Sequence, residues 1–378
     1  PMEMPQGVLA PLAKASRATL RIPVSVAGRI TDASAAEHML ESGTSDFVTL
    51  GRAMHADPEF PNKARDGRLD EICTCIACNQ GCSDMHARGL PIVCLVNTVP
   101  GRERDYAIRP AAQDKRIVVV GAGPAGLEAA RVLALRGHRV TLIEKDSEPG
   151  GQLLLNRHVP GREEMAGHIP WLANSAAKAG VRLEFSVEAD AALVMGEKPD
   201  IVIVATGAVP GLPQIPGVMN CPMVDAYEVL RRPKGASGRA LVIGGGIRGV
   251  GVARALADKS VEIVLVEPGR ELVTDIASRS RRFQIEGLAS RPNVTVHTRV
   301  TVEELKEHSA VLCDGKKQWE IDGIDLVIPT RMLVPVNALA DALYERANGT
   351  AIHLVGDCLH PRNALDAIHE AAALAHRL

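Results

Sequence analysis

Four cysteines within about twenty residues are the strongest chemical signal in the chain. Cys75, Cys78, Cys82 and Cys94 have the spacing C-x2-C-x3-C-x11-C. Thiolates are soft ligands that bind zinc or an iron–sulfur cluster. Zinc ribbons usually use two separated pairs, whereas three close cysteines and a distant fourth are typical of a [4Fe–4S] cluster. The spacing therefore predicts an iron–sulfur site, with zinc or four unliganded thiols as the alternatives.

Two further cysteines and two histidines are expected to have structural roles or to lie in solvent. Cys73 precedes the group by two residues and fits the downstream spacing less well as a ligand. Cys358 follows a Gly-Asp pair and is expected to be a packed residue. His158 and His168 are expected in a loop, as solvated side chains rather than catalysts.

A glycine-rich turn between a predicted strand and helix is the second signal. The strand at residues 115–120 leads into Gly121-Ala-Gly123-Pro-Ala-Gly126, and the next strand ends in Glu144. In a GxGxxG turn, the first glycine makes the bend, the second admits a pyrophosphate and the third lets helix and strand pack. Glu144 can accept hydrogen bonds from ribose hydroxyls. This complete unit predicts a dinucleotide site rather than a merely structural turn.

The same pattern recurs further along the chain. The strand at residues 240–243 precedes Gly244-Gly-Gly246-Ile-Arg-Gly249, and the strand at 262–267 ends in Glu267. A carboxylate near the ribose 2′-hydroxyl repels a 2′-phosphate, so Glu267 favours NADH over NADPH. Because strands of the first unit flank this repeat on both sides, we expect the second dinucleotide domain to be inserted in the first.

The first seventy residues read as two strand–helix units, each strand ending in Gly-Arg. The pairs are Gly28-Arg29 and Gly51-Arg52. Such loops bind a phosphate in (β/α)8 barrels, although two ordinary tight turns are the alternative. A barrel needs about 250 residues, and two units alone leave sheet edges bare. We therefore expect a fragment, or one half of a split enzyme whose partner chain supplies the rest of the barrel.

Composition excludes several classes of partner. The 378 residues carry a formal net charge of -2, and few are aromatic, so no nucleic acid is expected. No long apolar run or signal peptide is present, so no membrane is expected. The four cysteines outside the cluster motif are scattered, which favours a reducing, cytoplasmic location.

These motifs resemble one known family. The stretches at residues 53–65, 75–82 and 355–362 are similar to the C-terminal two-thirds of the iron–sulfur flavoenzymes related to old yellow enzyme. That group includes 2,4-dienoyl-CoA reductase and trimethylamine dehydrogenase. The resemblance covers essentially the whole chain, and the cysteine spacing looks more like the dienoyl-CoA reductase branch.

The resemblance implies four cofactor sites. The FMN phosphate would lie at Gly28, Arg29, Gly51 and Arg52, and the four cysteines of the spacing motif would bind the [4Fe–4S] cluster. FAD would be held by residues of the first dinucleotide domain, namely Gly121, Gly123, Ala125, Gly126, Glu144, Lys145, Gly151, Gln152, Ala205, Thr206, Gly207, Gly356 and Asp357. NAD(P)H would face Gly244, Gly246, Gly249 and Glu267.

The expected architecture is α/β in four parts. Residues 1–70 form the end of a (β/α)8 barrel, and residues 71–110 form the cluster segment. Residues 111–225 and 336–378 form a Rossmann-like FAD domain, and residues 226–335 form an inserted Rossmann-like NAD(P) domain.

The chain departs from the family pattern in three places. The barrel residues that transfer protons are absent, so no catalytic residue is assigned. Gly251 replaces a frequent acid, and Thr330-Arg-Met-Leu replaces an expected Ala-Thr-Gly turn. Both changes weaken the expectation of nicotinamide, so ADP or no ligand is the alternative for the inserted domain.

The cofactors suggest a function because a nicotinamide gives a hydride, a cluster takes single electrons and a flavin does both. The leading hypothesis is an oxidoreductase that passes electrons from NAD(P)H to FAD, the cluster and FMN, and reduces an activated C=C bond of a small molecule such as an enoate or enoyl-CoA. One alternative is an amine dehydrogenase or demethylase that passes electrons to an electron-transfer protein. Another is an electron-transfer subunit that docks on a separate barrel chain. An oligomer is expected.

Overall fold

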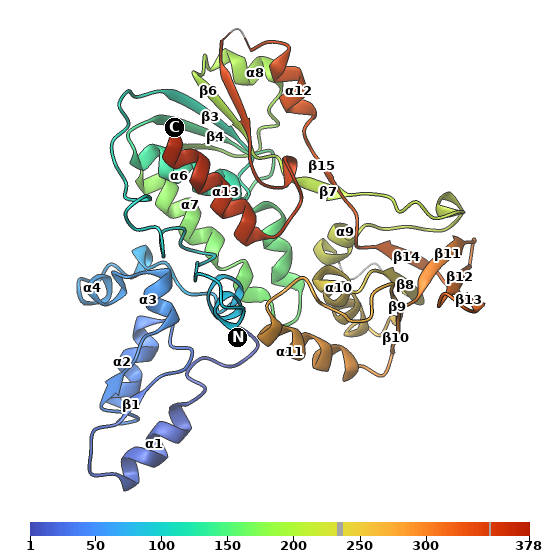
Figure 1. The fold of residues 1–378 in the computed structure, drawn as a ribbon, viewed down its shortest axis with the longest axis horizontal. Helices are drawn as coiled ribbons and strands as arrows, with labels where there is room; N and C mark the ends of the chain where they lie inside the picture. The colour runs from blue at the N-terminus through green and yellow to red at the C-terminus, as the bar shows by residue number, and fades with distance from the viewer. Residues whose placement is uncertain (233–236, 348) are drawn as a thin grey trace. The chain divides into compact units, whose positions relative to one another are not determined.

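Two parallel sheets, each covered by helices, organise the chain (Figure 1). The computed structural model describes residues 1–232, 237–347 and 349–378. One unit comprises residues 1–153, 164–206 and 337–378, and the other comprises residues 154–163 and 207–336. The four-part division expected from the sequence stays a prediction, and residues 233–236 of its inserted domain lie outside the described residues.

The first unit contains a five-stranded parallel sheet in the order β16-β6-β3-β4-β5. The strands are β3 (Arg116–Val120), β4 (Arg139–Ile143), β5 (Arg182–Glu184), β6 (Ile201–Val204) and β16 (Ala351–Leu354). The central strands are continuous Val/Ile runs because helices cover both faces of a parallel sheet. These helices are α6 (Pro124–Leu135), α7 (His168–Lys178), α8 (Ala191–Gly196), α12 (Ala338–Tyr344) and α13 (Ala364–Arg377). Helix α13 packs along α6, so the C-terminus of the chain lies in the first unit.

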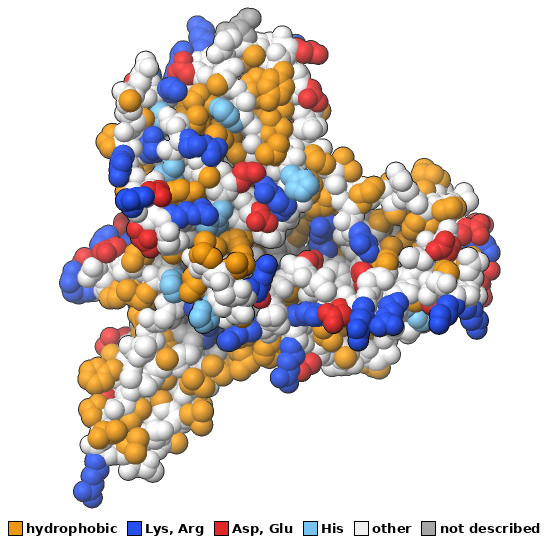
Figure 2. All heavy atoms as spheres, in the orientation of Figure 1, with side chains coloured by type: hydrophobic (Ala, Val, Ile, Leu, Met, Phe, Trp, Pro, Cys, Tyr) orange, Lys and Arg blue, Asp and Glu red, His pale blue; other side chains and the backbone are white. Residues whose placement is uncertain are grey.

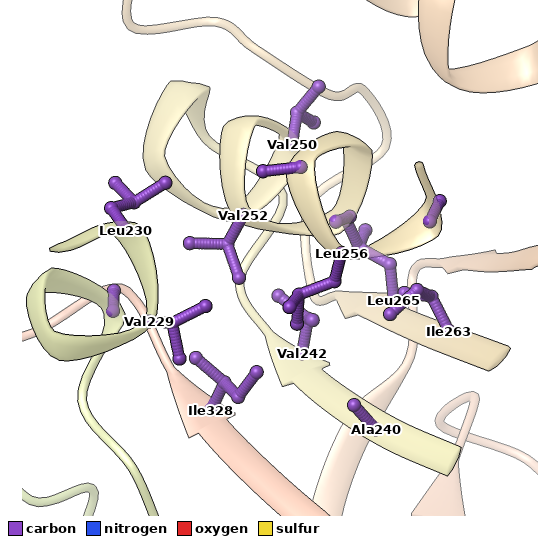
Figure 3. Packing of buried hydrophobic residues seen from close by; sticks show 14 of the residues in the cluster. Val229, Leu230, Ala240, Val242, Val250, Val252, Leu256, Ile263, Leu265 and Ile328 are labelled. Carbon is purple, nitrogen blue, oxygen red and sulfur yellow. The ribbon is translucent and has the colours of Figure 1, made fainter. Parts of the chain in front are cut away.

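The second unit contains a four-stranded parallel sheet in the order β10-β9-β8-β14. The strands are β8 (Arg239–Ile243), β9 (Glu262–Glu267), β10 (Val294–Thr298) and β14 (Leu326–Pro329), and the helices are α9 (Ala226–Arg231), α10 (Ile247–Ala257) and α11 (Ser278–Ala289). Figure 3 shows Val252 and Leu256 of α10 directed toward Val242 of the sheet. This buried cluster fixes the start of α10 at the end of β8.

Antiparallel strands complete the second unit. The strands β11 (Thr301–Leu305), β12 (Ser309–Cys313) and β13 (Gln318–Asp322) form one sheet, and β7 (Ala208–Pro210) pairs with β15 (Leu333–Pro335). Trp319 and Leu312 face each other across neighbouring strands and pack toward the parallel sheet.

The N-terminal residues form a small pair of parallel strands and four helices. The elements are α1 (Ala10–Thr19), β1 (Ser25–Val26), α2 (Ala33–Glu41), β2 (Phe47–Val48), α3 (Arg52–Ala56) and α4 (Phe60–Arg65). Asp32 caps α2 by accepting from the backbone N–H of Ala35 at 3.0 Å. No closed barrel occurs among the described residues. The α/β class and the Rossmann-like architecture are confirmed, whereas the assignment of residues 1–70 to a barrel stays a prediction.

Several of the segments that connect these elements contain short helical turns. They are the 3-10 turns Leu69–Glu71, Gly151–His158, Glu163–Met165, Val218–Asn220 and Gly356–Cys358, the π-helical turn Gln80–Asp84 and the short helix α5 (Met85–Ala87). In the part of the chain that the structure describes, no helix is both long and apolar enough to cross a membrane.

Candidate functional site

The four cysteines of the spacing motif line one hollow. It is bounded by Arg52, His55, Cys75, Ile76, Cys78, Asn79, Gly81, Cys82, Cys94, Leu95 and Val96. No three His, Cys, Asp or Glu side chains within residues 1–232, 237–347 and 349–378 are grouped so that they could hold one metal ion. The four thiols nevertheless line one shared space. Cysteine thiolates bind both zinc and iron–sulfur clusters, so the residues present fit either group.

Gly81 lets the two parts of the cysteine segment meet. Its carbonyl accepts from the N–H of Val93 at 2.7 Å, immediately before Cys94. A Cβ on Gly81 would lie 2.5 Å from the Val93 carbonyl oxygen, which is too close for any real side chain. Two residues of the same loop, Ala77 and Asn79, have positive φ values of 50° and 61°. The loop thus folds tightly enough for the distant fourth cysteine to join the first three.

Burial sets the protonation of these thiols. It raises the pKa of Cys78 and of Cys94 to about 12 and also raises the pKa of Cys75. Thiolates are the metal-binding form, and a bound cation stabilises them. A group that carries positive iron would therefore offset the cost of burying these charges.

The neighbouring cysteines behave as the sequence predicts. Cys73 does not line the hollow, and its Sγ donates to the Val96 carbonyl at 3.4 Å. Its backbone N–H donates to Asp57 at 2.9 Å. Cys358 is also buried, with its Sγ 3.1 Å from the Val204 carbonyl. Both thiols pack into the protein interior.

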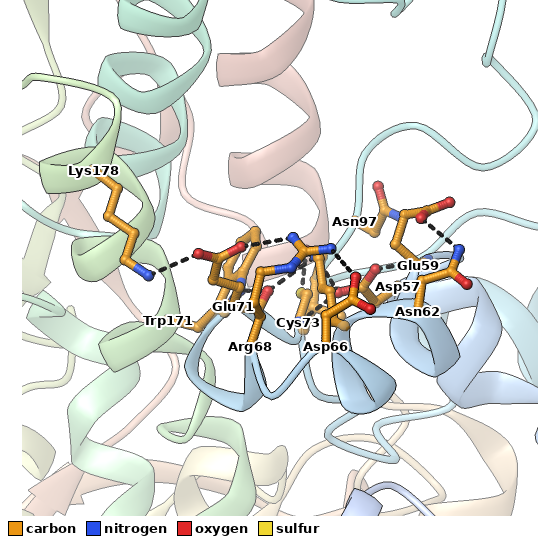
Figure 4. A network of polar contacts seen from close by, with 12 residues as sticks. Asp57, Glu59, Asn62, Asp66, Arg68, Glu71, Cys73, Asn97, Trp171 and Lys178 are labelled. Atoms are coloured by element: carbon orange, nitrogen blue, oxygen red, sulfur yellow. Dashed lines mark hydrogen bonds and ion pairs between the residues drawn. The ribbon is translucent and has the colours of Figure 1, made fainter.

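Polar contacts attach the cysteine segment to α7 (Figure 4). The indole N–H of Trp171 donates to the Glu71 carbonyl at 3.0 Å. Lys178 pairs with Asp70 at 2.7 Å and with Glu71 at 3.1 Å. These ion pairs are exposed and add little, because water screens them. The partly buried hydrogen bond from Trp171 therefore holds the segment against α7 more firmly.

His369 connects helix α13 to Cys94, the last cysteine of the spacing motif. Its Nε2 lies 2.8 Å from the Cys94 carbonyl, and its Nδ1 lies 3.3 Å from Nη1 of Arg102. A carbonyl only accepts and a guanidinium only donates, so Nε2 carries the proton and Nδ1 accepts. Burial lowers the pKa of His369, which agrees with this neutral form. No local motif marks His369 or Arg102, so neither residue was predicted from the sequence.

The first glycine-rich turn has the geometry of a dinucleotide site. Gly126 approaches the turn so closely that a Cβ would lie 1.9 Å from the Gly121 carbonyl oxygen. A Cβ on Gly123 would meet nothing within 4 Å, so the space before the start of α6 is open. The buried Glu144 carboxylate accepts from the N–H of Ala122 at 2.6 Å. An open, positively polarised helix start beside an acid fits the pyrophosphate and ribose of FAD.

Other residues predicted for FAD lie around the same turn. A Cβ on Gly151 would lie 3.5 Å from the Cα of Gly123, and Gly150 donates to the Ala122 carbonyl at 2.8 Å. The segment with Ala205, Thr206 and Gly207 follows β6, next to β3 in the sheet. Gly356 has φ +70° and donates to Glu370 of α13, and Asp357 accepts from the N–H of Arg362 at 3.0 Å. Lys145 is exposed, and Gln152 is half-buried in the turn that follows Gly150.

The second glycine-rich turn is built similarly but is covered. Glu267 accepts from the N–H of Gly245 at 2.7 Å. A Cβ on Gly249 would lie 1.8 Å from the Gly244 carbonyl oxygen. A Cβ on Gly246, however, would lie 2.8 Å from a carboxylate oxygen of Asp275. The residues present do not fit a pyrophosphate at this helix start as arranged.

The unusual residues after β14 also contact this turn. Thr330 donates to the Ile243 carbonyl at 3.0 Å, and Arg331 lies 3.3 Å from the Glu267 carboxylate. Gly251 faces Val159, since a Cβ there would lie 2.8 Å from that side chain. Thus the position expected to carry an acid is a packing site. The sequence analysis missed Asp275, which lies eight residues beyond Glu267 without a recognisable motif.

The two Gly-Arg pairs follow neighbouring parallel strands, β1 and β2. Arg29 is buried, donates to the Met2 carbonyl at 2.7 Å and pairs with Glu164. Arg52 donates to Asn79 of the cysteine loop at 2.6 Å. A Cβ on Gly51 would meet nothing within 4 Å. Topology therefore brings the predicted FMN residues to one end of the strand pair, although both guanidinium groups already have protein partners.

His168 differs from its expected place in a loop. It is the first residue of α7, is 2% exposed and stacks on Trp171 with ring centroids 5.5 Å apart. Burial lowers its pKa to about 4. The prediction of a solvated histidine was wrong because the spacing of apolar residues in α7 was not recognised.

Comparisons with known proteins give a consistent result. Residues 115–373 match the family model described as pyridine nucleotide-disulphide oxidoreductase. The chain is 33% identical over 399 residues to a protein named metal reductase from Desulforamulus reducens, covering 98% of this chain and 60% of that protein. It is 33% identical over 386 residues to a protein named NADH oxidase from Thermoanaerobacter brockii, covering 100% of this chain and 59% of that protein.

A solved structure extends the likeness. A 2-naphthoyl-CoA reductase in complex with 2-naphthoyl-CoA has a TM-score of 0.94 and 30% identity, and the match covers 100% of this chain and 57% of that one. This chain thus spans somewhat more than half the length of these relatives. Further relatives carry the names alkene reductase/demethylase OYE and dimethylamine dehydrogenase, so the resemblance is confirmed. The family model implies FAD and NAD(P) as cofactors. The chain belongs to the pyridine nucleotide-disulphide oxidoreductase family.

Proposed function

We propose that the chain is the electron-delivering part of a flavin and iron–sulfur oxidoreductase. In this proposal electrons pass from NAD(P)H to FAD, to a [4Fe–4S] cluster and to FMN, where an activated C=C bond of an enoate or enoyl-CoA type is reduced. The hollow lined by Cys75, Cys78, Cys82 and Cys94 is the observation that carries the proposal. The reductases among the relatives support the same reaction class.

The chain's own residues would position the cofactors. The four thiols would hold the cluster, and the open helix start at Gly123, with Glu144 beside it, would hold FAD. His369 keeps Cys94 against α13, which ends the FAD domain. When bound, the cluster carries single electrons and the flavins exchange both single electrons and hydrides. The protein supplies binding, orientation and exclusion of water.

Iron content of cysteine variants tests the cluster assignment. Cys78→Ser removes a thiolate from the hollow, so purified protein should lose most of its iron and acid-labile sulfide. Cys73→Ser is the matched control because Cys73 is buried nearby but does not line the hollow. Equal iron in both variants and in the wild type would contradict the assignment.

Anaerobic titration with NADH or NADPH tests the electron path. The oxidised-flavin absorbance of the wild-type holoprotein should disappear at about one equivalent of reductant per flavin, because a nicotinamide delivers a hydride to the flavin. The Cys78→Ser variant should still show loss of FAD absorbance, because FAD would lie before the cluster in the path. Flavin that stays oxidised with both nucleotides would contradict the NAD(P)H-linked function.

An amine dehydrogenase or demethylase is the second candidate. Relatives with such names support it, as does the covered nucleotide turn of the second unit. In this case electrons enter at FMN and leave through the cluster to an electron-transfer protein. Reduction of the flavin by methylated amines, in the absence of nicotinamide nucleotide, would select this function over the first.

The exposed apolar side chains of the N-terminal residues support a partner surface. Leu12, Ile22 and Phe47 are 66%, 68% and 60% exposed, and β1 and β2 pair with no other strand among the described residues. Figure 2 shows hydrophobic side chains gathered over this N-terminal part of the chain. We propose that the remaining strands of a barrel cover this surface, either from the same polypeptide or from a partner chain. An electron-transfer subunit docked on a separate barrel is the corresponding third candidate.

A further inference from the structure

The two glycine-rich turns of the chain provide an internal comparison. In the first, the N–H of Ala122 donates to Glu144 at 2.6 Å. In the second, the N–H of Gly245 donates to Glu267 at 2.7 Å. Each carboxylate lies twenty-two residues after its donor. The surroundings of the two turns can therefore be compared residue by residue.

The turns differ at the position of the second glycine. A Cβ on Gly123 would meet nothing within 4 Å, whereas a Cβ on Gly246 would lie 2.8 Å from Oδ2 of Asp275. Both carboxylate oxygens of Asp275 lie 3.0 Å from the backbone nitrogen of Ile247, the first residue of α10. In dinucleotide folds this helix start binds the pyrophosphate. A carboxylate of the protein therefore lies where the anionic part of a ligand would bind.

Residues 270–276, which we name the strap, hold Asp275 in this position. The N–H of Val273 donates to the Gly245 carbonyl at 2.8 Å, so the strap lies across the glycine turn. Arg281 of α11 donates to the Leu272 carbonyl at 2.7 Å and pairs with Glu271 at 2.9 Å. Contacts at both the turn and α11 therefore define the closed arrangement.

The strap also contains an unfavourable backbone conformation. Val273 has φ +55°, and a β-branched residue in the left-handed region is a genuine outlier. Such conformations persist only where the surrounding contacts impose them. Asp275 itself is exposed, so its side chain can leave the helix start without disturbing the buried core.

We propose that Asp275 is an intramolecular occupant of the pyrophosphate position, so that a dinucleotide binds the second unit only when the Asp275 side chain leaves the start of α10. Two anions cannot share the same backbone N–H group and helix start, because they repel each other and compete for one donor. Asp275 thus lowers the affinity for NADH, NADPH and ADP, which all carry a pyrophosphate. This inference rests on the proposed nucleotide role of the second unit.

Equilibrium binding to the full chain with its bound cofactors tests the proposal. Isothermal titration calorimetry would measure Kd for NADH, NADPH and ADP with the wild type and with Asp275→Ala and Asp275→Asn. We expect Asp275→Ala to bind each ligand about tenfold more tightly, the size expected for losing one competing charged hydrogen bond. Asp275→Asn should gain less, because the amide keeps an acceptor but loses the charge. Adenosine, which lacks phosphate, should bind all three proteins equally.

Glu286→Gln is the matched control, since it removes an exposed carboxylate of α11 that pairs with Arg282 rather than with the strap or the start of α10. It should bind nucleotides as the wild type does. Equal or weaker binding by Asp275→Ala would overturn the proposal, and so would the absence of binding in every variant. Tighter binding by Asp275→Ala without any flavin reduction would support the blocking role of Asp275 and contradict the proposed electron path from NAD(P)H. Failure of this inference can therefore be distinguished from failure of the proposed function.

Discussion

At the scale of single residues, Gly81 and His168 occupy positions where the surrounding atoms leave little room for another side chain. Gly81 permits a backbone contact that any side chain would block. His168 fills a buried position in which both ring nitrogens lack a hydrogen-bond partner among the residues that the structure describes. Replacing either residue should therefore change the stability of the protein, whatever its substrate is.

Gly81→Ala should disrupt the cysteine hollow. Its Cβ would overlap the Val93 carbonyl oxygen and push the segment before Cys94 away, so we expect a loss of about 1–3 kcal/mol in the free energy of unfolding. Iron content should fall as well. Gly196→Ala is the control because a Cβ there meets nothing within 4 Å. Urea unfolding and iron analysis check both variants, and retained iron in Gly81→Ala would contradict the geometry.

His168 should make stability depend on pH. Its folded pKa of about 4 is lower than the value near 6.5 in the unfolded chain, so the unfolded state binds more protons between these values. Stability should therefore fall as pH drops from 6.5 toward 4, by up to roughly 3 kcal/mol from this residue. His168→Phe should reduce this slope in urea unfolding measured at several pH values. An equal slope in His168→Phe and in the wild type would contradict the assignment of a buried, neutral His168.

At the scale of elements, a strand, a glycine turn and a helix together form each dinucleotide motif. The third glycine of the first turn serves packing, whereas the second faces open space. The same amino-acid change at these two positions should therefore have different consequences.

Gly123→Ala should lower FAD content while leaving the free energy of unfolding of the FAD-free protein nearly unchanged. Gly126→Ala should instead destabilise the fold by about 1–3 kcal/mol, because its Cβ would overlap the Gly121 carbonyl oxygen. Flavin analysis and urea unfolding separate the two effects. Full FAD content in a correctly folded Gly123→Ala protein would show that the pyrophosphate does not bind at this helix start.

The sequence predicted the elements with strong patterns. The strands and helices of both glycine motifs lie where the apolar runs and the glycine spacing place them, and β9 has the predicted bounds. The antiparallel strands β11, β12 and β13 were not predicted, because alternation over five residues is a weak signal beside the Rossmann pattern. Asp275 and His369 were also missed. Their roles arise from contacts between residues distant in sequence, which no local spacing encodes.

At the scale of the whole molecule, the chain joins a cysteine hollow and an open dinucleotide turn in one unit. The second unit carries a turn of the same design covered by its own carboxylate. This difference suggests that access of nucleotide to the second unit is a controlled step. The apolar side chains exposed over the N-terminal residues support the proposal that further strands of a barrel cover this surface.

The iron, acid-labile sulfide, zinc and flavin content of the anaerobically purified chain tests the central claim most directly. We expect about four iron and four sulfide per chain, as in one [4Fe–4S] cluster, together with about one FAD. Colourless protein that contains zinc and no sulfide would contradict the account, because no group between the flavin sites could then carry single electrons.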